Sequence, residues 1–202
     1  MMDKQQDIFG SEDLVDLLSA RGRLQQASAS LFKAKGYSQT TVRDIAAKVG
    51  IQSGSIFHHF KNKEQILVSV MADSVLRVLL SMESGLAIAT STKDKISCLI
   101  QCELNAIHDE ELAGFRLLIS EWRSLSGDNQ KKILCLRDRY EAIWSQVLNN
   151  AQSEGLIHTE SFYLRGFIRG ATIETCNWYK PSGSVSLAAL TDKLMLSIVC
   201  RV

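Results

Sequence analysis

Hydrophobic residues recur with helical spacing along most of the chain. Between residues 21 and 35, Leu24, Ala27, Leu31 and Phe32 follow the spacing that places side chains on one face of a helix. The same spacing predicts further helices at about 63–84, 93–108, 110–125, 129–154, 161–179 and from 186 onward. The chain has a single proline in 202 residues. The pattern predicts an all-α protein and disfavours a β-sandwich or barrel, which needs many turns.

Three short predicted helices follow one another in the first third of the chain. The first ends at Gly36, a residue that suits the left-handed conformation common just after a helix. Thr40 or Thr41 can cap the second helix, which ends at Gly50, and the third runs to about His59. Three helices joined by glycine-marked turns are typical of a helix-turn-helix unit.

The distribution of charge supports DNA as a partner. The whole chain has a formal net charge of only +1, but residues 20–63 carry eight Lys and Arg against one acid, Asp44, for a net of +7. The remainder therefore sums to −6. A short cationic segment on an acidic body is expected of a DNA-binding protein, because phosphates attract cations.

Residues 40–64, TTVRDIAAKVGIQSGSIFHHFKNKE, carry a characteristic motif. It comprises Thr40-Thr41, Ile45-Ala46, Gly50-Ile51, Gly54, Phe57-His58-His59-Phe60 and Lys63-Glu64. In these residues the chain resembles the TetR family of bacterial one-component regulators, strongly over about residues 20–70 and mainly in architecture beyond. It departs from the family at Phe57, where relatives carry tyrosine, and at Gln52, which replaces a small capping residue. We therefore expect Ser53 to cap the third helix.

The resemblance implies a homodimeric repressor with about nine helices. We expect a partly disordered N-terminal extension at 1–19, a helix-turn-helix domain at 20–64, and a ligand-binding and dimerisation domain at 65–202. Within the extension, Leu14, Val15, Leu17 and Leu18 either lengthen the first helix or form a short turn. A small-molecule effector would then shift the fourth helix and release a palindromic operator in double-stranded DNA.

The predicted DNA contacts come from the second and third helices and from the residues that follow them. The small Gly54 lets the third helix approach base edges, and the N-terminus of a helix is a phosphate site. A metal site at His58-His59 is disfavoured, because adjacent helical positions point about 100° apart. The predicted DNA-binding residues are Thr40, Thr41, Arg43, Gln52, Ser53, Gly54, Ser55, Phe57, His58, His59, Lys61 and Lys63, while Phe60 is expected to anchor the helix in the core.

The resemblance also implies that the last two predicted helices form the dimer interface. Gly166 and Gly170 are four residues apart, which lets another helix pack closely, and we expect Arg165 and Arg169 to pair across the interface. The alternative is a helix buried in its own core. A palindrome requires two recognition helices about 34–36 Å apart, which also favours a dimer. The predicted interface residues are Arg165, Gly166, Arg169, Gly170, Leu190, Leu194 and Ile198.

Candidate effector contacts are large or polar residues on apolar faces of the middle helices. They are Cys98, Cys102, Asn105, His108, Phe115, Arg116, Trp122, Arg123, Tyr140 and Trp144. For each, a core residue or a surface charge is the alternative. The cysteines lack the spacing of a zinc site, so we expect no metal, and we expect no cofactor. Residues 177–183, NWYKPSG, are similar to a tail in family members that respond to acyl-CoA thioesters, so an acyl-CoA or another hydrophobic effector is our hypothesis.

Other classes of protein are less well supported. No Gly-rich phosphate loop, nucleophile elbow or zinc-hydrolase motif is present, so we do not expect an enzyme. A small helical enzyme and a DNA-binding protein without an effector remain the alternatives. We find no signal peptide and no uninterrupted apolar run long enough to span a bilayer. The five scattered cysteines are expected to be reduced and mostly buried, which favours a cytoplasmic protein without a membrane partner.

Overall fold

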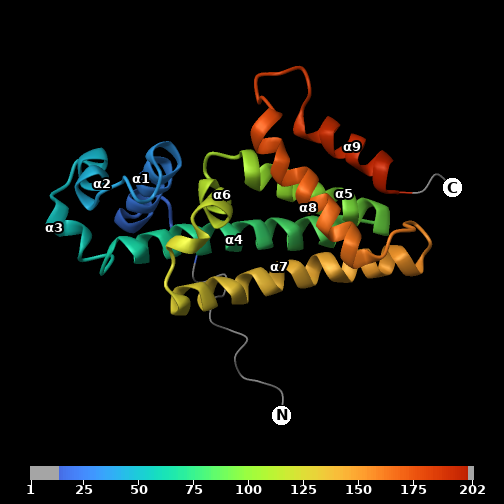
Figure 1. Cartoon of the computed structure of the whole chain (residues 1–202), viewed down its shortest axis with the longest axis horizontal. Coiled ribbons are helices and arrows are strands. Elements are labelled where there is room, and N and C mark those ends of the chain that lie inside the picture. Colours follow the sequence, from blue (N-terminus) through green and yellow to red (C-terminus); the bar gives the residue numbers. More distant parts are fainter. Residues whose placement is uncertain (1–13, 200–202) are drawn as a thin grey trace, which may run out of the picture. The chain divides into compact units, whose positions relative to one another are not determined.

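The structure, a computed structural model, describes residues 14–199, and this part of the chain is all-α (Figure 1). Nine α-helices and a short 3-10 helix are present there without a strand, which confirms the predicted fold class. They are α1 (Ala20–Lys35), α2 (Val42–Val49), α3 (Ser53–Ile56), α4 (Lys63–Ile88), α5 (Thr92–His108), α6 (Ala113–Ser120), η2 (Trp122–Ser124), α7 (Gly127–Ser153), α8 (Ser161–Trp178) and α9 (Leu187–Ile198).

The helices form two compact units. Among the described residues, the first contains 14–77 together with Glu110–Arg137, and the second contains Val78–Asp109 together with 138–199. The first part of α4 and of α7 therefore belongs to the first unit, and the rest of each helix belongs to the second. The helix-turn-helix thus shares its unit with α6, η2 and the start of α7.

Local signals in the sequence explain where the DNA-binding helices begin and end. Thr41 and Asp44 form a capping box at the start of α2, in which each side chain accepts from the other residue's backbone N–H. The hydrogen bonds from Thr41 lower the pKa of Asp44. Gly50 ends α2 with φ 76°, a left-handed conformation that glycine adopts without strain, and its N–H donates to the carbonyls of Ala46 and Ala47.

Three predicted helices end elsewhere than expected. The third was expected to run to about His59, whereas α3 ends at Ile56. We expected Gly85 to end the fourth helix, but α4 continues to Ile88. Gly85 serves close packing instead, because a Cβ there would lie 2.3 Å from the Sγ of Cys98 on α5. The predicted helix at 110–125 is shorter, since α6 ends at Ser120 and the chain continues as η2.

The first unit has a core shared by the helix-turn-helix and α4. Leu24 and Phe32 of α1, Ile45 of α2, and Leu67 and Met71 of α4 are buried. At its N-terminal edge the chain forms a short turn at Leu17–Ser19, the second of the two possibilities that we considered for this segment. Residues 1–13 of the predicted extension lie outside the described residues.

A second glycine brings α6 against α4 within this unit. A Cβ on Gly114 would lie 2.4 Å from the backbone oxygen of Val70 and 2.4 Å from the Oγ of Ser74. The two helices therefore approach each other more closely than any residue with a Cβ would permit.

The second unit is built on α5, which packs against α8 and α9. Ile96, Leu99 and Ile100 of α5 are fully buried, as is Trp144 of α7. The hydroxyl of Thr191 on α9 donates to the Oε1 of Gln101 on α5 (3.0 Å). This unit therefore has a hydrophobic core of its own.

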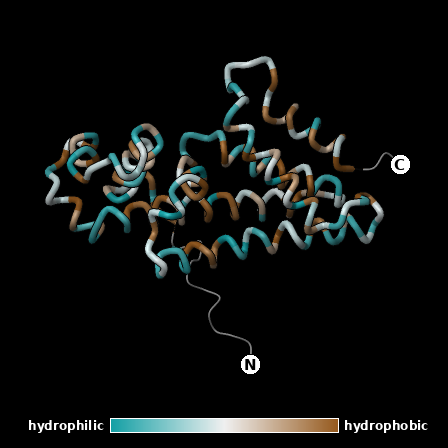
Figure 2. The backbone as a smooth tube through the Cα atoms, in the orientation of Figure 1, coloured by the Kyte–Doolittle hydropathy of each residue, from teal (hydrophilic) through white to brown (hydrophobic). Residues whose placement is uncertain are grey.

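Helix α4 and the cysteines concern two further expectations. By length and mean hydropathy α4 is apolar enough to cross a membrane, although Asp73 and Arg77 interrupt its apolar sequence. Of its most apolar window, 72% is buried inside the protein, as in a core helix. Figure 2 shows the hydrophobic residues along this helix. The thiols are less buried than expected. Cys102 is buried, Cys98 and Cys176 are half-buried, and Cys135 is exposed, because it lies on the outer side of α7. Cys200 lies outside the described residues.

Candidate DNA-binding and effector sites

The short helix α3 is held from beneath by two apolar side chains. Ile56 is 1% exposed and Phe60, just after the helix, is 2% exposed. Phe60 therefore anchors the end of α3 in the core, as expected. The N-cap of α3 is Gln52, whose side chain makes no capping bond, and Ser53 is the first helical residue. Ser53 is therefore not the cap that we expected, because the helix begins at Ser53 itself.

The outer side of α3 is polar and open. Most of the predicted contact residues are on this side: Gln52, Gly54, Phe57 and His58 are exposed, and Ser53, Ser55 and His59 are half-exposed. A Cβ on Gly54 would meet nothing within 4 Å. This surface combines donors, acceptors and a residue without a side chain, which suits contact with base edges in the major groove.

Two cations beside α3 remain available for phosphates. Arg43 on α2 and Lys61 after α3 are exposed, and neither lies within ion-pairing distance of a carboxylate in the described part of the chain. Thr41 is exposed at the N-terminus of α2, where it both caps the helix and can face a phosphate.

Two predicted contact residues have structural roles instead. Thr40 is 0% exposed, and its hydroxyl donates to the carbonyl of Gly36 (2.8 Å). The Nζ of Lys63 donates to the carbonyls of Tyr37 (2.8 Å) and Thr40 (2.9 Å) and lies 4.2 Å from the centre of the Tyr37 ring. Lys63 therefore joins the start of α4 to the turn between α1 and α2, with its Nζ directed at backbone carbonyls.

The neighbouring Glu64 joins α4 to the start of α7. Its carboxylate accepts from the backbone N–H of Ser126 (2.6 Å) and from the Nδ2 of Asn129 (2.8 Å). These hydrogen bonds, with that from Asn129 the largest contribution, lower the pKa of Glu64. Adjacent residues at the start of α4 thus contact the helix-turn-helix on one side and α7 on the other.

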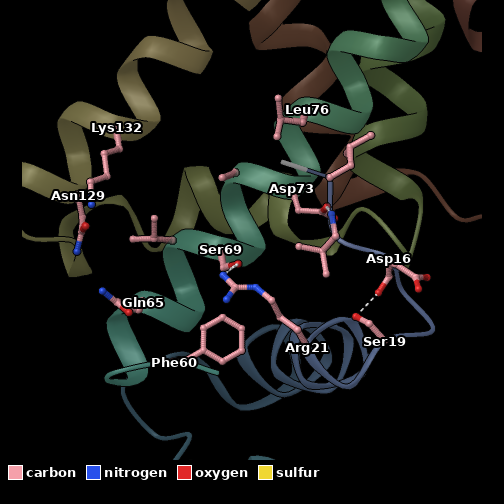
Figure 3. A pocket seen from close by; sticks show the side chains of 14 residues that line it. Asp16, Ser19, Arg21, Phe60, Gln65, Ser69, Asp73, Leu76, Asn129 and Lys132 are labelled. Atoms are coloured by element: carbon pink, nitrogen blue, oxygen red, sulfur yellow. Dashed lines mark hydrogen bonds between the residues drawn. The ribbon is translucent and has the colours of Figure 1, made fainter. Parts of the chain in front are cut away.

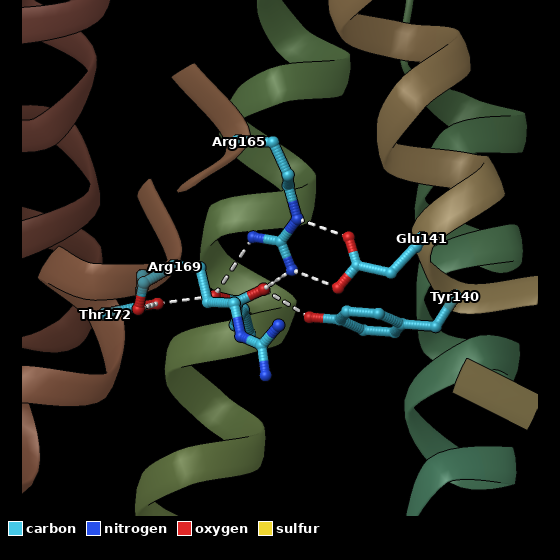
Figure 4. Close-up of polar contacts among 6 residues, drawn as sticks. Tyr140, Glu141, Arg165, Arg169 and Thr172 are labelled. Carbon is cyan, nitrogen blue, oxygen red and sulfur yellow. Dashed lines mark hydrogen bonds and ion pairs between the residues drawn. The ribbon is translucent and has the colours of Figure 1, made fainter. Parts of the chain in front are cut away.

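The second unit contains a buried polar network that the sequence did not lead us to expect (Figure 4). At its centre is Glu103 of α5, whose side chain is 3% exposed. Its carboxylate accepts hydrogen bonds from Tyr140 of α7 and Thr172 of α8, and lies 3.0 Å from the Nη2 of Arg165. The signal was present in the sequence, because Glu103 falls on the same helical face as Ile96, Leu99 and Ile100.

Arg165 is the cation of this network. Its Nε lies 2.8 Å from the Oε2 of Glu141, and its guanidinium lies 4.4 Å from the centre of the Trp144 ring. Burial alone would lower the pKa of Arg165, but the carboxylates of Glu103 and Glu141 outweigh it, so the pKa is raised. Burial, with Glu103, also raises the pKa of Tyr140. Arg165 therefore remains charged and is paired within its own chain, not across an interface as expected.

The structure separates the predicted effector residues into two groups. Phe115, Arg116, Trp122 and Arg123 belong to the first unit, whereas Cys98, Cys102, Asn105, His108, Tyr140 and Trp144 belong to the second. Asn105 is exposed, and its Oδ1 accepts from Gln101. The Nε2 of His108 lies 2.8 Å from the Oγ1 of Thr175, and the rings of His108 and Tyr179 pack at a tilt of 59° with their centres 4.7 Å apart.

Helix α8 exposes an aromatic and glycine-rich face. Phe162 is 81% exposed and Phe167 is 66% exposed. Gly166 and Gly170 have open space where a Cβ would lie, and Arg169 is exposed. On α9, Leu190 is buried, while Leu194 and Ile198 are half-buried. The interface candidates on α8 other than Arg165 thus lie on an outward face.

Two models of known protein families match successive parts of the chain. Residues 24–70 match the model for bacterial regulatory proteins of the tetR family, and residues 89–201 match the tetracyclin repressor-like C-terminal domain. The transcriptional repressor KstR2 of Mycolicibacterium smegmatis is 32% identical over 171 residues, which cover 83% of each chain.

Two solved structures share the fold. The superantigen PfiT is 43% identical, with a TM-score of 0.80 over 92% of this chain and 98% of that one. AibR, solved in complex with isovaleryl coenzyme A and operator DNA, has a TM-score of 0.79 at 18% identity, over 88% of this chain and 97% of that one. The chain therefore belongs to the TetR family, and it is a DNA-binding transcriptional regulator.

Proposed function

We propose that the protein is a repressor that binds a palindromic operator through α3 and is released by an acyl-CoA thioester. The observation that supports DNA contact by α3 is that one side of the segment is buried in the core and the other side is exposed. Ile56 and Phe60 are buried beneath it, while Gln52, Gly54 and His58 face outward. Such a helix can enter the major groove without disturbing its own core.

We assign DNA contact to the exposed residues of this surface. Gln52, Ser53 and Ser55 would contact base edges, with Gly54 allowing close approach, and Arg43 would lie at the edge of the groove. Thr41, Phe57, His58, His59 and Lys61 would face the phosphates. The segment 20–64 is the DNA-binding part in this assignment, and residues 65–202 bind the effector and the second protomer.

The aromatic face of α8 supports a homodimer. Phe162, Tyr163 and Phe167 are exposed beside Gly166 and Gly170, and large exposed apolar groups of this kind are common at protein interfaces. We propose that this face meets its equivalent in a second copy, with Arg169 at the edge and with contributions from Leu194 and Ile198 of α9.

The effector assignment rests on the second unit and on one similarity. Tyr140, Trp144 and Cys102, which are buried, and the half-buried His108 carry both apolar and hydrogen-bonding groups on α5 and α7, and AibR was solved with isovaleryl coenzyme A. We propose that the acyl chain of an acyl-CoA binds there and displaces α4, whose N-terminus holds the helix-turn-helix through Lys63. In this proposal the protein acts in the cytoplasm by binding alone and catalyses no reaction.

Selection of bound sequences from a random pool of duplex DNA tests operator binding. We expect one palindrome, with half-site centres about one helical turn apart, because a twofold dimer presents two equivalent helices. Sedimentation of the free protein should give the mass of a dimer. A monomer that enriches no sequence at low salt would overturn the proposal.

A titration of the protein–operator complex with acyl-CoAs of increasing chain length tests the effector. We expect a matching acyl-CoA to weaken operator binding by about 5–150-fold, the usual range of allosteric coupling. The same ligand should stabilise the free protein by about 2.7 kcal/mol at a concentration 100 times its Kd. Free coenzyme A is the control. If no acyl-CoA changes either the operator affinity or the thermal stability, the effector class is wrong while operator binding stands.

A further inference from the structure

The C-terminal end of α3 needs a partner that its own helix cannot supply. Helix α3 has only one turn, and the last carbonyls of a helix have no intrahelical donor. The backbone N–H groups of His59 and Phe60 still donate back to Ile56. The carbonyl of His59 lies beyond these bonds, immediately after the exposed residues proposed to contact DNA.

Arg21 of α1 supplies this partner from a different helix. Its Nη1 donates to the carbonyl of His59 (3.1 Å), and its guanidinium lies 4.5 Å from the centre of the Phe60 ring. Figure 3 shows the side chain lying between the Phe60 ring and Ser69. Arg21 therefore contacts both the last residue of the DNA-facing segment and the side chain that anchors it.

The other end of the guanidinium is fixed to α4. Its Nη2 donates to the Oγ of Ser69 (3.2 Å), and the same oxygen accepts from the Nε2 of Gln25 (2.7 Å), a side chain of α1 that is buried. A planar guanidinium can hold two acceptors at once in a fixed geometry, which a lysine ammonium cannot reproduce.

A cleft of about 540 Å³ lies beside this contact in the first unit, lined by Phe60, Gln65, Ser69, Asn129 and Lys132 among others (Figure 3). Arg21 itself is exposed and has no carboxylate within ion-pairing distance among residues 14–199. Removal of its side chain would therefore widen this cleft and leave the exposed carbonyl of His59 to water.

We propose that Arg21 is a positioning residue for operator recognition: it fixes the end of α3 to α4 and does not itself neutralise a phosphate. The inference rests on operator binding by α3, proposed above. In this inference α1 helps to fix the recognition helix α3. Ser69 is the residue of α4 that holds α3 indirectly, through its hydrogen bond with Arg21.

The test distinguishes a role of Arg21 in positioning α3 from a direct electrostatic contact between Arg21 and a phosphate. Operator Kd is measured by fluorescence anisotropy as a function of salt for the wild type, Arg21→Lys, Arg21→Gln and Ser69→Ala. A direct phosphate contact contributes about −0.9 to the slope of log K against log salt, whereas a positioning residue contributes nothing to it. We expect both Arg21 variants to weaken binding about 10-fold at fixed salt, and Ser69→Ala to weaken it about 3-fold, all with the wild-type slope.

Arg23→Gln is the matched control, because this exposed arginine is two residues away and donates to the carbonyl of Leu18 instead. Its Kd should stay within about 2-fold of the wild type, and thermal unfolding of every variant shows whether the fold is intact. Wild-type affinity in Arg21→Lys, together with a slope reduced by about one in Arg21→Gln, would show a phosphate contact and overturn the proposal. Unchanged affinity in all Arg21 variants would overturn it as well, whereas a wild type that binds no operator would refute the proposed function instead.

Discussion

Replacing Arg165 with methionine will lower the free energy of unfolding by about 3–5 kcal/mol, because it leaves the carboxylate of Glu103 buried without its cation. Methionine retains much of the aliphatic contact, so the loss reports on the charge. Tyr140 and Thr172 still donate to Glu103, but two neutral hydroxyls do not balance a full negative charge in a dry interior. Urea unfolding of the purified protein measures the effect.

Two further variants show whether the unpaired carboxylate is the cause. In the double variant Glu103→Gln with Arg165→Met the buried charge is absent, so most of the lost stability should return. Lys93→Met removes an exposed cation at the start of α5, the helix that carries Glu103, and should change the free energy of unfolding by less than about 0.5 kcal/mol. Equal losses in the single and double variants would show that packing around Arg165 matters and its charge does not.

Replacing Gly54 with glutamate will weaken operator binding by about 100-fold or more, equivalent to about 2.7 kcal/mol. The position has open space for a Cβ, so the free protein should keep its fold and thermal stability. In the complex, the new carboxylate would lie among the phosphates and base edges, where repulsion between like charges costs several kcal/mol. Anisotropy with the selected operator measures the change.

Gly127→Glu is the control for added charge. Gly127 also has open space, and it lies at the start of α7, away from α3 in the sequence and on a different helix. A carboxylate in the first turn of a helix is favourable for stability, and the operator affinity of this variant should remain within a few-fold of the wild type. If both variants bind the operator as the wild type does, the DNA-binding surface does not include α3.

The helix-turn-helix could be predicted from sequence because its signals are local. Gly50 and the Thr41–Asp44 capping box act within four residues of the helix ends that they determine. The buried pair Ile56 and Phe60 likewise follows from helical spacing. These interactions are short-range, so their chemistry is visible in the order of residues along the chain.

The contacts of Lys63 and Arg165 differ from the expectation, because the partners of both side chains are distant in sequence. Lys63 binds carbonyls 23 and 26 residues away, and Arg165 binds carboxylates 24 and 62 residues away. A charged side chain gives no indication in sequence of whether it faces DNA, a second protomer or its own core. Gly85 shows the same limit for small residues, since a glycine can end a helix or admit the side chain of a neighbouring helix.

The contact at Gly114 determines how motion passes within the first unit. Between helices separated by side chains, rotamer changes can absorb a small shift. Here the α6 backbone rests against the carbonyl of Val70, and no flexible atoms lie between the two at that point. We therefore expect a displacement of α4 at this point to move α6 with it, so that the two helices shift together when a ligand displaces α4.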